Sequence, residues 1–160
     1  MRRLMLAAWI IAALAGLGSA TASANSPVPQ QKPQDSELQC LALNVYWEGR
    51  SEPLEGQRAI AHLTLNRVAH GKFPKTVCDV VDEGLSRQAC QFHWRCDSKA
   101  DAPYNRAQWA RSLAVAREAL AGKSADPTKG AVYLHAHYVR PTWFTTRQLT
   151  TRIAGHVFYR

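Results

Sequence analysis

The sequence predicts an α+β fold, mainly helical, with a small antiparallel sheet. Three stretches of the chain carry apolar residues at helical spacing, whereas residues 131–139 (AVYLHAHYV) alternate and are rich in aromatic and β-branched residues, which is typical of a strand. The four cysteines are an even number, as expected of disulfides in a small exported domain. No repeat is visible, and the length suits one domain with its own core.

The N-terminus has the three-part pattern of a secretory signal peptide. Arg2 and Arg3 precede an uncharged apolar run over residues 4–17, and small residues then lead to an A-x-A motif at 22–24. The apolar run is short for a membrane span, which needs about 20 residues. We therefore expect residues 1–24 to be cleaved off; an uncleaved anchor, or cleavage at Ala20, is the alternative.

The remaining chain divides into a leader and one folded domain. Residues 25–36 are rich in Pro and Gln and have little to bury, so a flexible leader is expected there. The domain is expected over residues 37–160, as a monomer without a stable membrane span. Loss of two arginines from 20 Lys and Arg, against 12 Asp and Glu, leaves a charge of 18 minus 12, about +6. Such a charge suits a cell wall or another anionic surface, and the dispersed basic residues do not favour nucleic acid.

The first helix is expected to begin at Ser36, which can cap it with Gln39 at the capping-box position. Its apolar residues recur at helical spacing: Leu38, Leu41, Ala42 and Val45. Glu48 follows three residues after the last of these and therefore projects on the same inward side, next to the helix stop at Gly49.

Two further helices and two strands complete the expected elements. A second helix follows Pro53, over residues 54–70, and a long loop pinned by a disulfide covers residues 82–104. A third helix starts after the cap Asn105, and its expected apolar face is Trp109, Leu113, Ala116 and Leu120. The tail, residues 153–159 (IAGHVFY), is expected to form the second strand, with Gly155 as a bulge or turn.

Glu48 is the candidate catalytic residue. Burial at the inward end of a helix raises the pKa of a carboxyl group, because the charged form loses its water. A carboxylic acid that stays protonated near neutral pH is the general acid that a glycosidase needs. The alternative is a surface glutamate paired with Arg50 or Arg67. Nothing in the sequence selects a second carboxylate, but one acid is sufficient if the 6-hydroxyl of the sugar, rather than water, attacks the anomeric carbon.

The cysteines favour one pairing of three. Cys90 and Cys96 enclose a short loop, so Cys90–Cys96 with Cys40–Cys78 is preferred. A zinc site would require closer pairs such as C-x2-C. A cysteine nucleophile beside His93 is disfavoured by an oxidising compartment.

Aromatic, amide and imidazole side chains cluster in two segments and suit a carbohydrate, whose faces pack on rings while its polar groups form hydrogen bonds. The candidate substrate-binding residues are Gln91, Trp94, Tyr133, His135 and Trp143. Ordinary core positions are the alternative for the aromatic residues. His135 and His137 share a strand face, but no further ligand stands at zinc-site spacing, so no metal or other cofactor is expected.

The chain resembles the SleB-like cell wall hydrolases, the family of the spore cortex-lytic enzyme catalytic domain. The resemblance is carried in order by residues 40–53 (CLALNVYWEGRSEP), 65–68 (LNRV), 73–78 (FPKTVC), 90–97 (CQFHWRCD), 139–143 (VRPTW) and 156–160 (HVFYR). In one departure, Ile153-Ala154-Gly155-His156 replaces the isoleucine–glycine–x–histidine pattern of the family.

The resemblance implies a lysozyme-like catalytic domain that cuts the glycan strands of peptidoglycan, secreted or periplasmic and associated with the wall. It places the catalytic acid at Glu48 and cleft residues at Gln91, Trp94, Tyr133 and His135. It also implies a lytic transglycosylase, which uses one acid and leaves a 1,6-anhydro-muramyl end. A zinc-dependent peptidoglycan amidase or endopeptidase and a non-catalytic wall-binding module are the alternatives.

Overall fold

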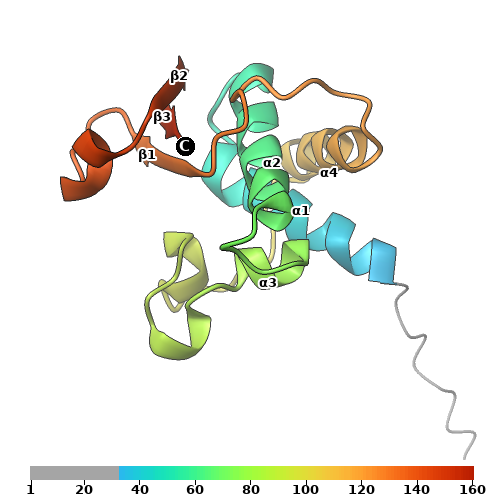
Figure 1. Ribbon diagram of the computed structural model, residues 1–160. Coiled ribbons are helices and arrows are strands. Elements are labelled where there is room, and N and C mark those ends of the chain that lie inside the picture. Colours follow the sequence, from blue (N-terminus) through green and yellow to red (C-terminus); the bar gives the residue numbers. More distant parts are fainter. Residues whose placement is uncertain (1–32) are drawn as a thin grey trace, which may run out of the picture. The chain divides into compact units, whose positions relative to one another are not determined.

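The computed structural model describes residues 33–160, which form helices and a small sheet (Figure 1). The helices are α1 (Pro33–Gly49), α2 (Leu54–Ala69), α3 (Val77–Val81), η1 (Leu85–Arg87), η2 (His93–Cys96), α4 (Arg106–Leu120) and η3 (Thr142–Thr146). The strands are β1 (Tyr133–Ala136), β2 (Leu149–Ile153) and β3 (His156–Tyr159), all antiparallel, in the order β1-β3-β2. The α+β, mainly helical fold is thereby confirmed. The expected signal peptide and residues 25–32 of the expected leader lie outside the described residues.

Helix α1 starts earlier than predicted, at Pro33 rather than Ser36. A proline is favoured at the first helical position, and Asp35 in the first turn interacts well with the helix dipole. Ser36 therefore lies inside the helix and is not its cap, and residues 33–36 of the expected leader are helical.

The core lies between α1, α2 and α4, which contact one another pairwise. Its fully buried apolar side chains include Leu41, Val45, Ile60, Leu63, Val80, Val115 and Phe158. Helix α4 begins after Asn105 as predicted, since the Asn105 side chain accepts a hydrogen bond from the backbone N–H of Gln108 (3.1 Å).

The buried face of α4 differs from the predicted one. It consists of Ser112, Val115, Ala116 and Ala119, whereas Leu120 is 39% exposed and Trp109 and Leu113 are only half-buried. The face is rotated so that small side chains meet α1 and α2, which allows the helices to approach closely, while the larger side chains cover the edge of the contact.

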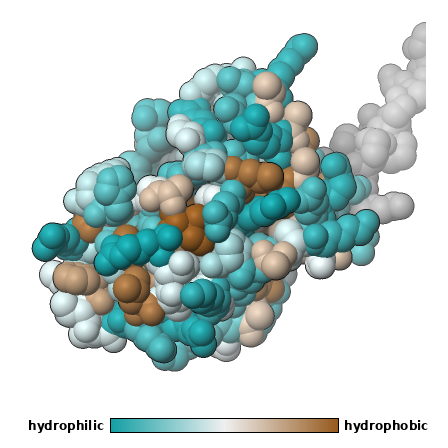
Figure 2. Space-filling model, turned by 90° about the horizontal axis from the view of Figure 1, so that it is seen from above, coloured by the Kyte–Doolittle hydropathy of each residue, from teal (hydrophilic) through white to brown (hydrophobic). Residues whose placement is uncertain are grey.

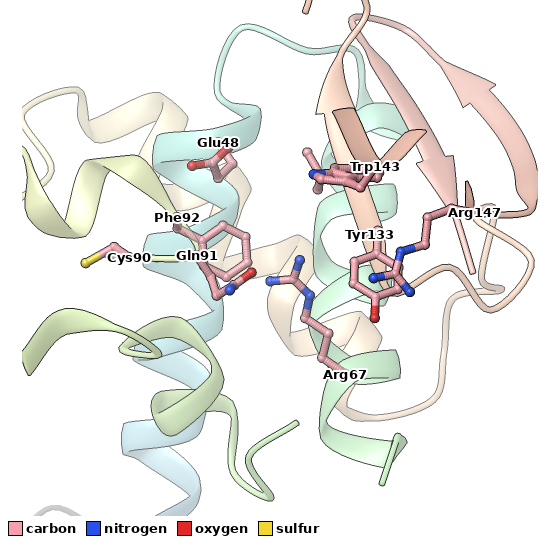
Figure 3. Close-up of a pocket in the computed structure, with 9 residues that line it drawn as sticks. Glu48, Arg67, Cys90, Gln91, Phe92, Tyr133, Trp143 and Arg147 are labelled. Atoms are coloured by element: carbon pink, nitrogen blue, oxygen red, sulfur yellow. The ribbon is translucent and has the colours of Figure 1, made fainter. Parts of the chain in front are cut away.

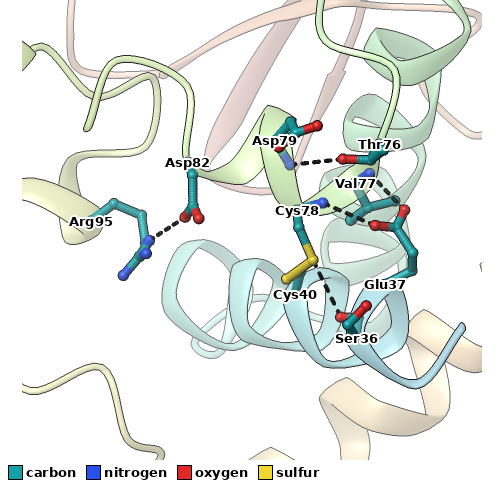
Figure 4. The surroundings of a disulfide bond; sticks show 9 residues. All are labelled: Ser36, Glu37, Cys40, Thr76, Val77, Cys78, Asp79, Asp82 and Arg95. Carbon is teal, nitrogen blue, oxygen red and sulfur yellow. Dashed lines mark hydrogen bonds and ion pairs between the residues drawn. A yellow bond between two sulfur atoms is a disulfide. The ribbon is translucent and has the colours of Figure 1, made fainter. Parts of the chain in front are cut away.

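Both preferred disulfides are present. Cys40–Cys78 links α1 to α3, with the two Cα atoms 5.2 Å apart (Figure 4). Cys90–Cys96 closes the short loop that contains η2. The Glu37 carboxylate on α1 also accepts a hydrogen bond from the backbone N–H of Val77 at the start of α3 (2.7 Å). Helix α3 is therefore fixed to α1 by a covalent and a polar contact.

The C-terminal tail contains the expected turn at Gly155, but it forms a hairpin, because a strand that was not predicted, β2, precedes the turn. Strands β2 and β3 pair on either side of a turn at Ala154 and Gly155. Ala154 adopts a left-handed backbone conformation (φ 48°), which reverses the chain at that point. Strand β1 is shorter than the predicted 131–139 and pairs with β3.

The face of the molecule seen in Figure 2 is predominantly polar. In Figure 2 hydrophobic residues form small separate groups among hydrophilic ones. The exposed large apolar side chains come from several elements: Leu54, Tyr104, Leu120, Tyr138, Val139 and Leu149. Of the helices in residues 33–160, none has the length and apolar character required to cross a membrane.

Candidate active site

Glu48 lies in the last turn of α1 with its side chain half-buried. Its carboxyl group forms no hydrogen bond or ion pair with any residue of the described part of the chain. Burial raises the pKa of this group from 4.5 to about 7, and the positive charge of Arg67 opposes the rise. Both carboxyl forms are therefore populated near neutral pH, as a group that must donate and then accept a proton requires.

Arg67 approaches the same space from the last turn of α2. It continues the buried stripe of that helix, and its side chain is only 4% exposed. The Nε atom donates a hydrogen bond to the carbonyl of Val132 (2.8 Å), and the guanidinium carbon lies 5.1 Å from the centre of the Phe92 ring. The Nη1 atom is buried and has no hydrogen-bond partner among the described residues. Burial lowers the pKa of Arg67 to about 10, so the group remains charged.

Glu48 and Arg67 open into a pocket of about 360 Å³. Figure 3 shows their side chains entering it from two helices, with the disulfide loop on one side and the sheet region on the other. The remaining lining residues are Cys90, Gln91, Phe92, Tyr133, Leu134, Trp143 and Arg147. Tyr133 and Trp143 form an aromatic wall, with ring centres 5.9 Å apart. The pocket thus combines rings, an amide, two cations and one acid.

Glu48 also lines a second hollow, of about 400 Å³. Glu48 and Leu134 line both hollows. The others around the second are Trp47, Glu52, Ala136, His137, Tyr138, Gly155 and His156. Glu48 consequently stands between two binding spaces, which suits a polymeric substrate extending past the acid in both directions.

The structure brings together Glu48 and three of the five candidate substrate-binding residues, namely Gln91, Tyr133 and Trp143. Trp94 is instead a core residue, 7% exposed, because its indole N–H donates to the buried Asn44 side chain (3.1 Å) and its ring stacks on Trp47. His135 lines neither hollow and instead contacts Trp143, one of the two aromatic residues of the pocket wall. Its Nε2 atom is 2.9 Å from the Tyr159 hydroxyl, and its ring contacts Trp143 edge-on.

The sequence interpretation did not place three charged residues in the site. The sequence contained a signal for Arg67, because this charged residue continues the apolar stripe of its helix. Glu48 was predicted to be a site residue for the same reason in α1. Arg147 lies between η3 and β2, with its guanidinium carbon 3.8 Å from the Tyr133 ring centre, and has no local pattern. Glu52 accepts a hydrogen bond from the backbone N–H of Gly155 (3.1 Å), a contact across 103 positions.

Glu52 is a fixed carboxylate at the edge of the second hollow. One oxygen accepts the Gly155 N–H, and the other lies 3.4 Å from Nδ1 of His156. Glu52 thereby attaches the β2–β3 turn to the segment between α1 and α2. Within residues 33–160, no group of three or more His, Cys, Asp or Glu side chains is arranged to hold a metal ion.

A half-buried acid of raised pKa between two aromatic-lined hollows is the arrangement of enzymes that cleave polysaccharide chains. The chain belongs to the cell wall hydrolase family, because the sequence model described as Cell Wall Hydrolase matches residues 51–159. The resemblance noted in the sequence is thereby confirmed. Glu48 lies just before the matched segment.

Curated relatives agree with this assignment. The chain is 34% identical over 138 residues to a spore cortex-lytic enzyme of Oceanobacillus iheyensis. The alignment covers 82% of this chain and 44% of that protein. A spore cortex-lytic enzyme of Bacillus subtilis is 32% identical over 127 residues, or 78% of this chain and 37% of the relative. The chain therefore spans less than half the length of these two relatives.

Solved structures with a similar fold are catalytic domains. The catalytic domain of the Bacillus cereus SleB protein superposes with a TM-score of 0.64 at 29% identity, covering 87% of this chain and 100% of that domain. The catalytic domain of the germination-specific lytic transglycosylase SleB from Bacillus anthracis gives a TM-score of 0.59 at 26% identity, covering 84% and 100%. The described domain therefore has the fold of a SleB catalytic domain.

Proposed function

We propose that this chain is an exported enzyme that cleaves peptidoglycan glycan strands at the MurNAc–GlcNAc linkage, with Glu48 as its single catalytic acid. The observation that carries the proposal is the position of Glu48, an unpaired acid with a pKa of about 7 between two hollows. The family assignment supports the substrate class, since cell wall hydrolases act on the bacterial wall.

In the first step, protonated Glu48 donates its proton to the glycosidic oxygen. The bond between that oxygen and the anomeric carbon breaks, and the leaving sugar departs as an alcohol. Positive charge develops on the sugar ring, as in glycosidase transition states generally. The Glu48 carboxylate produced by this transfer is the negative group beside that charge.

In the second step, the Glu48 carboxylate takes the proton of the 6-hydroxyl of the same muramic acid residue as its oxygen bonds to the anomeric carbon. The product is a 1,6-anhydro end, and Glu48 returns to its protonated form. Glu48 is the only carboxyl group of the described residues that lines the first pocket. Glu52 lines only the second hollow, and one of its carboxylate oxygens accepts the Gly155 N–H, so it is poorly placed to act as a nucleophile. These two facts, with the lytic transglycosylase named for one structural neighbour, favour the 6-hydroxyl over water.

The substrate is held by the walls of the pocket. Tyr133 and Trp143 offer ring faces for a sugar, and the Gln91 amide offers hydrogen bonds to hydroxyl or acetamido groups. Trp94 and His135 act indirectly. Trp94 stacks on Trp47, and His135 contacts Trp143, so each helps to position an aromatic ring that lines a hollow. Export and wall association are favoured by the two disulfides, which form in oxidising compartments, and by the basic charge of the chain.

The test is digestion of purified sacculi by the wild type, by Glu48→Gln and by the control Glu55→Gln, whose side chain is exposed in the first turn of α2. We expect Glu48→Gln to release no soluble fragments and the control to act like the wild type. Mass spectrometry of the fragments separates the two mechanisms, since an anhydro end is one water lighter than a reducing end. Full activity of a folded Glu48→Gln protein would overturn the assignment.

A further inference from the structure

The first pocket contains two guanidinium groups without an ion-pair partner. Arg67 is buried with its Nη1 atom unsatisfied, and Arg147 is half-buried with its Nε atom unsatisfied. Neither forms a salt bridge with a carboxylate of the described residues, whereas Arg58 and Arg95 do. Buried polar groups are almost always hydrogen-bonded, so two incomplete guanidinium groups in one pocket indicate a missing acceptor.

The charged groups around Arg67 do not supply that acceptor. Glu83, Tyr133 and Glu48 all influence Arg67 electrostatically, but Glu83 is too far for an ion pair, and its own Oε2 atom is buried without a partner. When Glu48 carries the proton that the proposed mechanism requires, its negative charge is absent, and neither arginine forms an ion pair with another carboxylate of the described residues. Two guanidinium groups without an ion-pair partner in a partly desolvated space favour the binding of an anion.

We propose that Arg67 and Arg147 bind the free lactyl carboxylate of the N-acetylmuramic acid residue next to the bond that is cleaved, so that the substrate is peptide-free glycan. The inference rests on the proposed function. In a strand that bears stem peptides this carboxyl is an amide and carries no charge. In a strand whose peptides have been removed it is a free carboxylate, whose two oxygens match the planar fork of a guanidinium group.

The size of the pocket favours the lactyl group over a carboxylate of the stem peptide. Its volume of about 360 Å³ is near the lower end of the ~300–1,000 Å³ that small-molecule pockets occupy. Arg67, Arg147 and the proton donor Glu48 line this one pocket. The anion therefore belongs to the N-acetylmuramic acid residue whose glycosidic bond is cleaved, not to a peptide extending away from it. The enzyme would accordingly act after an amidase-type reaction has freed the carboxylate.

The binding test uses full-length Glu48→Gln protein, which is expected to bind without turnover. Calorimetry is performed with three forms of the GlcNAc–MurNAc disaccharide: the free acid, the uncharged methylamide of the lactyl group, and the L-Ala-D-Glu dipeptide conjugate. We expect the free acid to bind about tenfold or more tighter than the methylamide, as for a charged hydrogen bond. Equal affinities, tighter binding of the conjugate, or no binding of any form would each overturn the proposal.

Two further variants, each combined with Glu48→Gln, assign the effect to the pocket. Arg147→Gln should reduce the preference for the free acid to less than about threefold, because the retained Arg67 then acts alone. Arg152→Gln removes the same charge from an exposed position on β2 that does not line the pocket, and should keep the full preference. An unchanged preference in the Arg147 variant contradicts the proposal.

Turnover distinguishes this inference from the proposed function. Wild-type protein should release fragments faster from amidase-treated sacculi than from untreated sacculi. Equal rates on both would overturn the inference and leave the glycan-cleaving function intact. Failure to cleave either substrate, together with tight binding of the free acid only, would overturn the function and leave the anion site standing.

Discussion

Glu48 and Arg67 enter one pocket from the last turns of two neighbouring helices, and no ion pair joins them. A direct ion pair would hold Glu48 as a carboxylate and remove the proton that the proposed mechanism requires. Without that ion pair, burial raises the pKa of Glu48 to about 7, and the charge of Arg67 only opposes part of the rise. Burial of Glu48 and the absence of an ion pair to Arg67 therefore leave this carboxyl group able to hold a proton near neutral pH.

The pH dependence of cleavage follows from this relationship. We expect kcat/KM to fall as pH rises through about 7, because the free enzyme then loses the proton of Glu48. Arg67→Gln removes a positive charge that favours the carboxylate, so the pKa of Glu48 rises and the alkaline limb moves to higher pH. Arg67→Lys keeps the charge and should leave the limb close to its wild-type position. A profile that moves to lower pH in the Gln variant would refute this account.

Glu48 should also cost the protein stability at neutral pH. Its folded pKa lies above the unfolded value of 4.5, so the folded state binds the proton more tightly and stability falls as pH rises from 4.5 to about 7. A shift of this size corresponds to at most roughly 3 kcal/mol, and partial exposure reduces the effect to about 1–2 kcal/mol.

Glu48→Gln therefore combines lost activity with greater stability. Urea unfolding at pH 8 should give a higher free energy of unfolding for this variant than for the wild type, and the difference should shrink toward pH 4.5. Glu55→Gln, in an exposed position, should not show that pH-dependent gain. Identical pH dependence in Glu48→Gln and the wild type would mean that the Glu48 carboxyl is well solvated.

The long-range disulfide Cys40–Cys78 should contribute more to stability, and the short-range disulfide Cys90–Cys96 should contribute more to activity. Cys40–Cys78 spans 38 positions and Cys90–Cys96 spans 6, so the loop-entropy estimate gives about 4 and about 2 kcal/mol of stabilisation. Replacing Cys40 and Cys78 by Ser should thus lower the unfolding midpoint more. Replacing Cys90 and Cys96 should reduce turnover more, since Cys90, Gln91 and Phe92 line the pocket. A larger loss of turnover in the 40/78 variant would contradict the proposed role of the short loop.

The parts of the site that sequence could predict depend on local spacing. Glu48 follows the apolar face of its own helix, so its inward direction is fixed by residues within one or two turns. The short disulfide could be favoured because loop length limits the alternatives. Arg147 and Glu52 gave no such signal, since each acquires its neighbours only when the sheet folds back onto the helices.

Aromatic residues and the tail show why the rest could not be predicted. An indole ring suits a core and a sugar site equally, and Trp94 lies in the core because Asn44, fifty positions away, accepts its N–H. In the tail, Gly155 indicated a turn, but the strand before it, β2, was not predicted, and its pairing with β3 brings Ala154 into a left-handed conformation. The contact of Trp94 with Asn44 and the pairing of β2 with β3 both involve residues outside the segments used for the predictions.

The β2–β3 turn leads to the last prediction. Ala154 occupies the left-handed position of the turn (φ 48°), where the isoleucine–glycine–x–histidine pattern of the family resembled has glycine. This conformation costs about 1–2 kcal/mol for a residue with a Cβ atom, and the greater freedom of glycine in the unfolded chain offsets part of it. Ala154→Gly should therefore raise the free energy of unfolding by about 0.5–1 kcal/mol.

Gly155→Ala should have the opposite effect, although the two positions are adjacent. A Cβ atom at this position would lie 2.6 Å from Oε1 of Glu52, so the Glu52 side chain must move and lose its hydrogen bond to the Gly155 N–H. We expect the free energy of unfolding, measured in urea, to fall by about 1–2 kcal/mol. Turnover should also be lower, because Glu52 and Gly155 line the second hollow beside Glu48.

Two control backgrounds test the role of Glu52. In a Glu52→Gln background the amide oxygen can still accept the hydrogen bond from the residue 155 N–H, so the stability penalty of Gly155→Ala should remain. In Glu52→Ala the obstructing carboxyl group is absent, so the penalty should largely disappear. Equal penalties in the Glu52→Ala and wild-type backgrounds would show that the turn does not depend on Glu52.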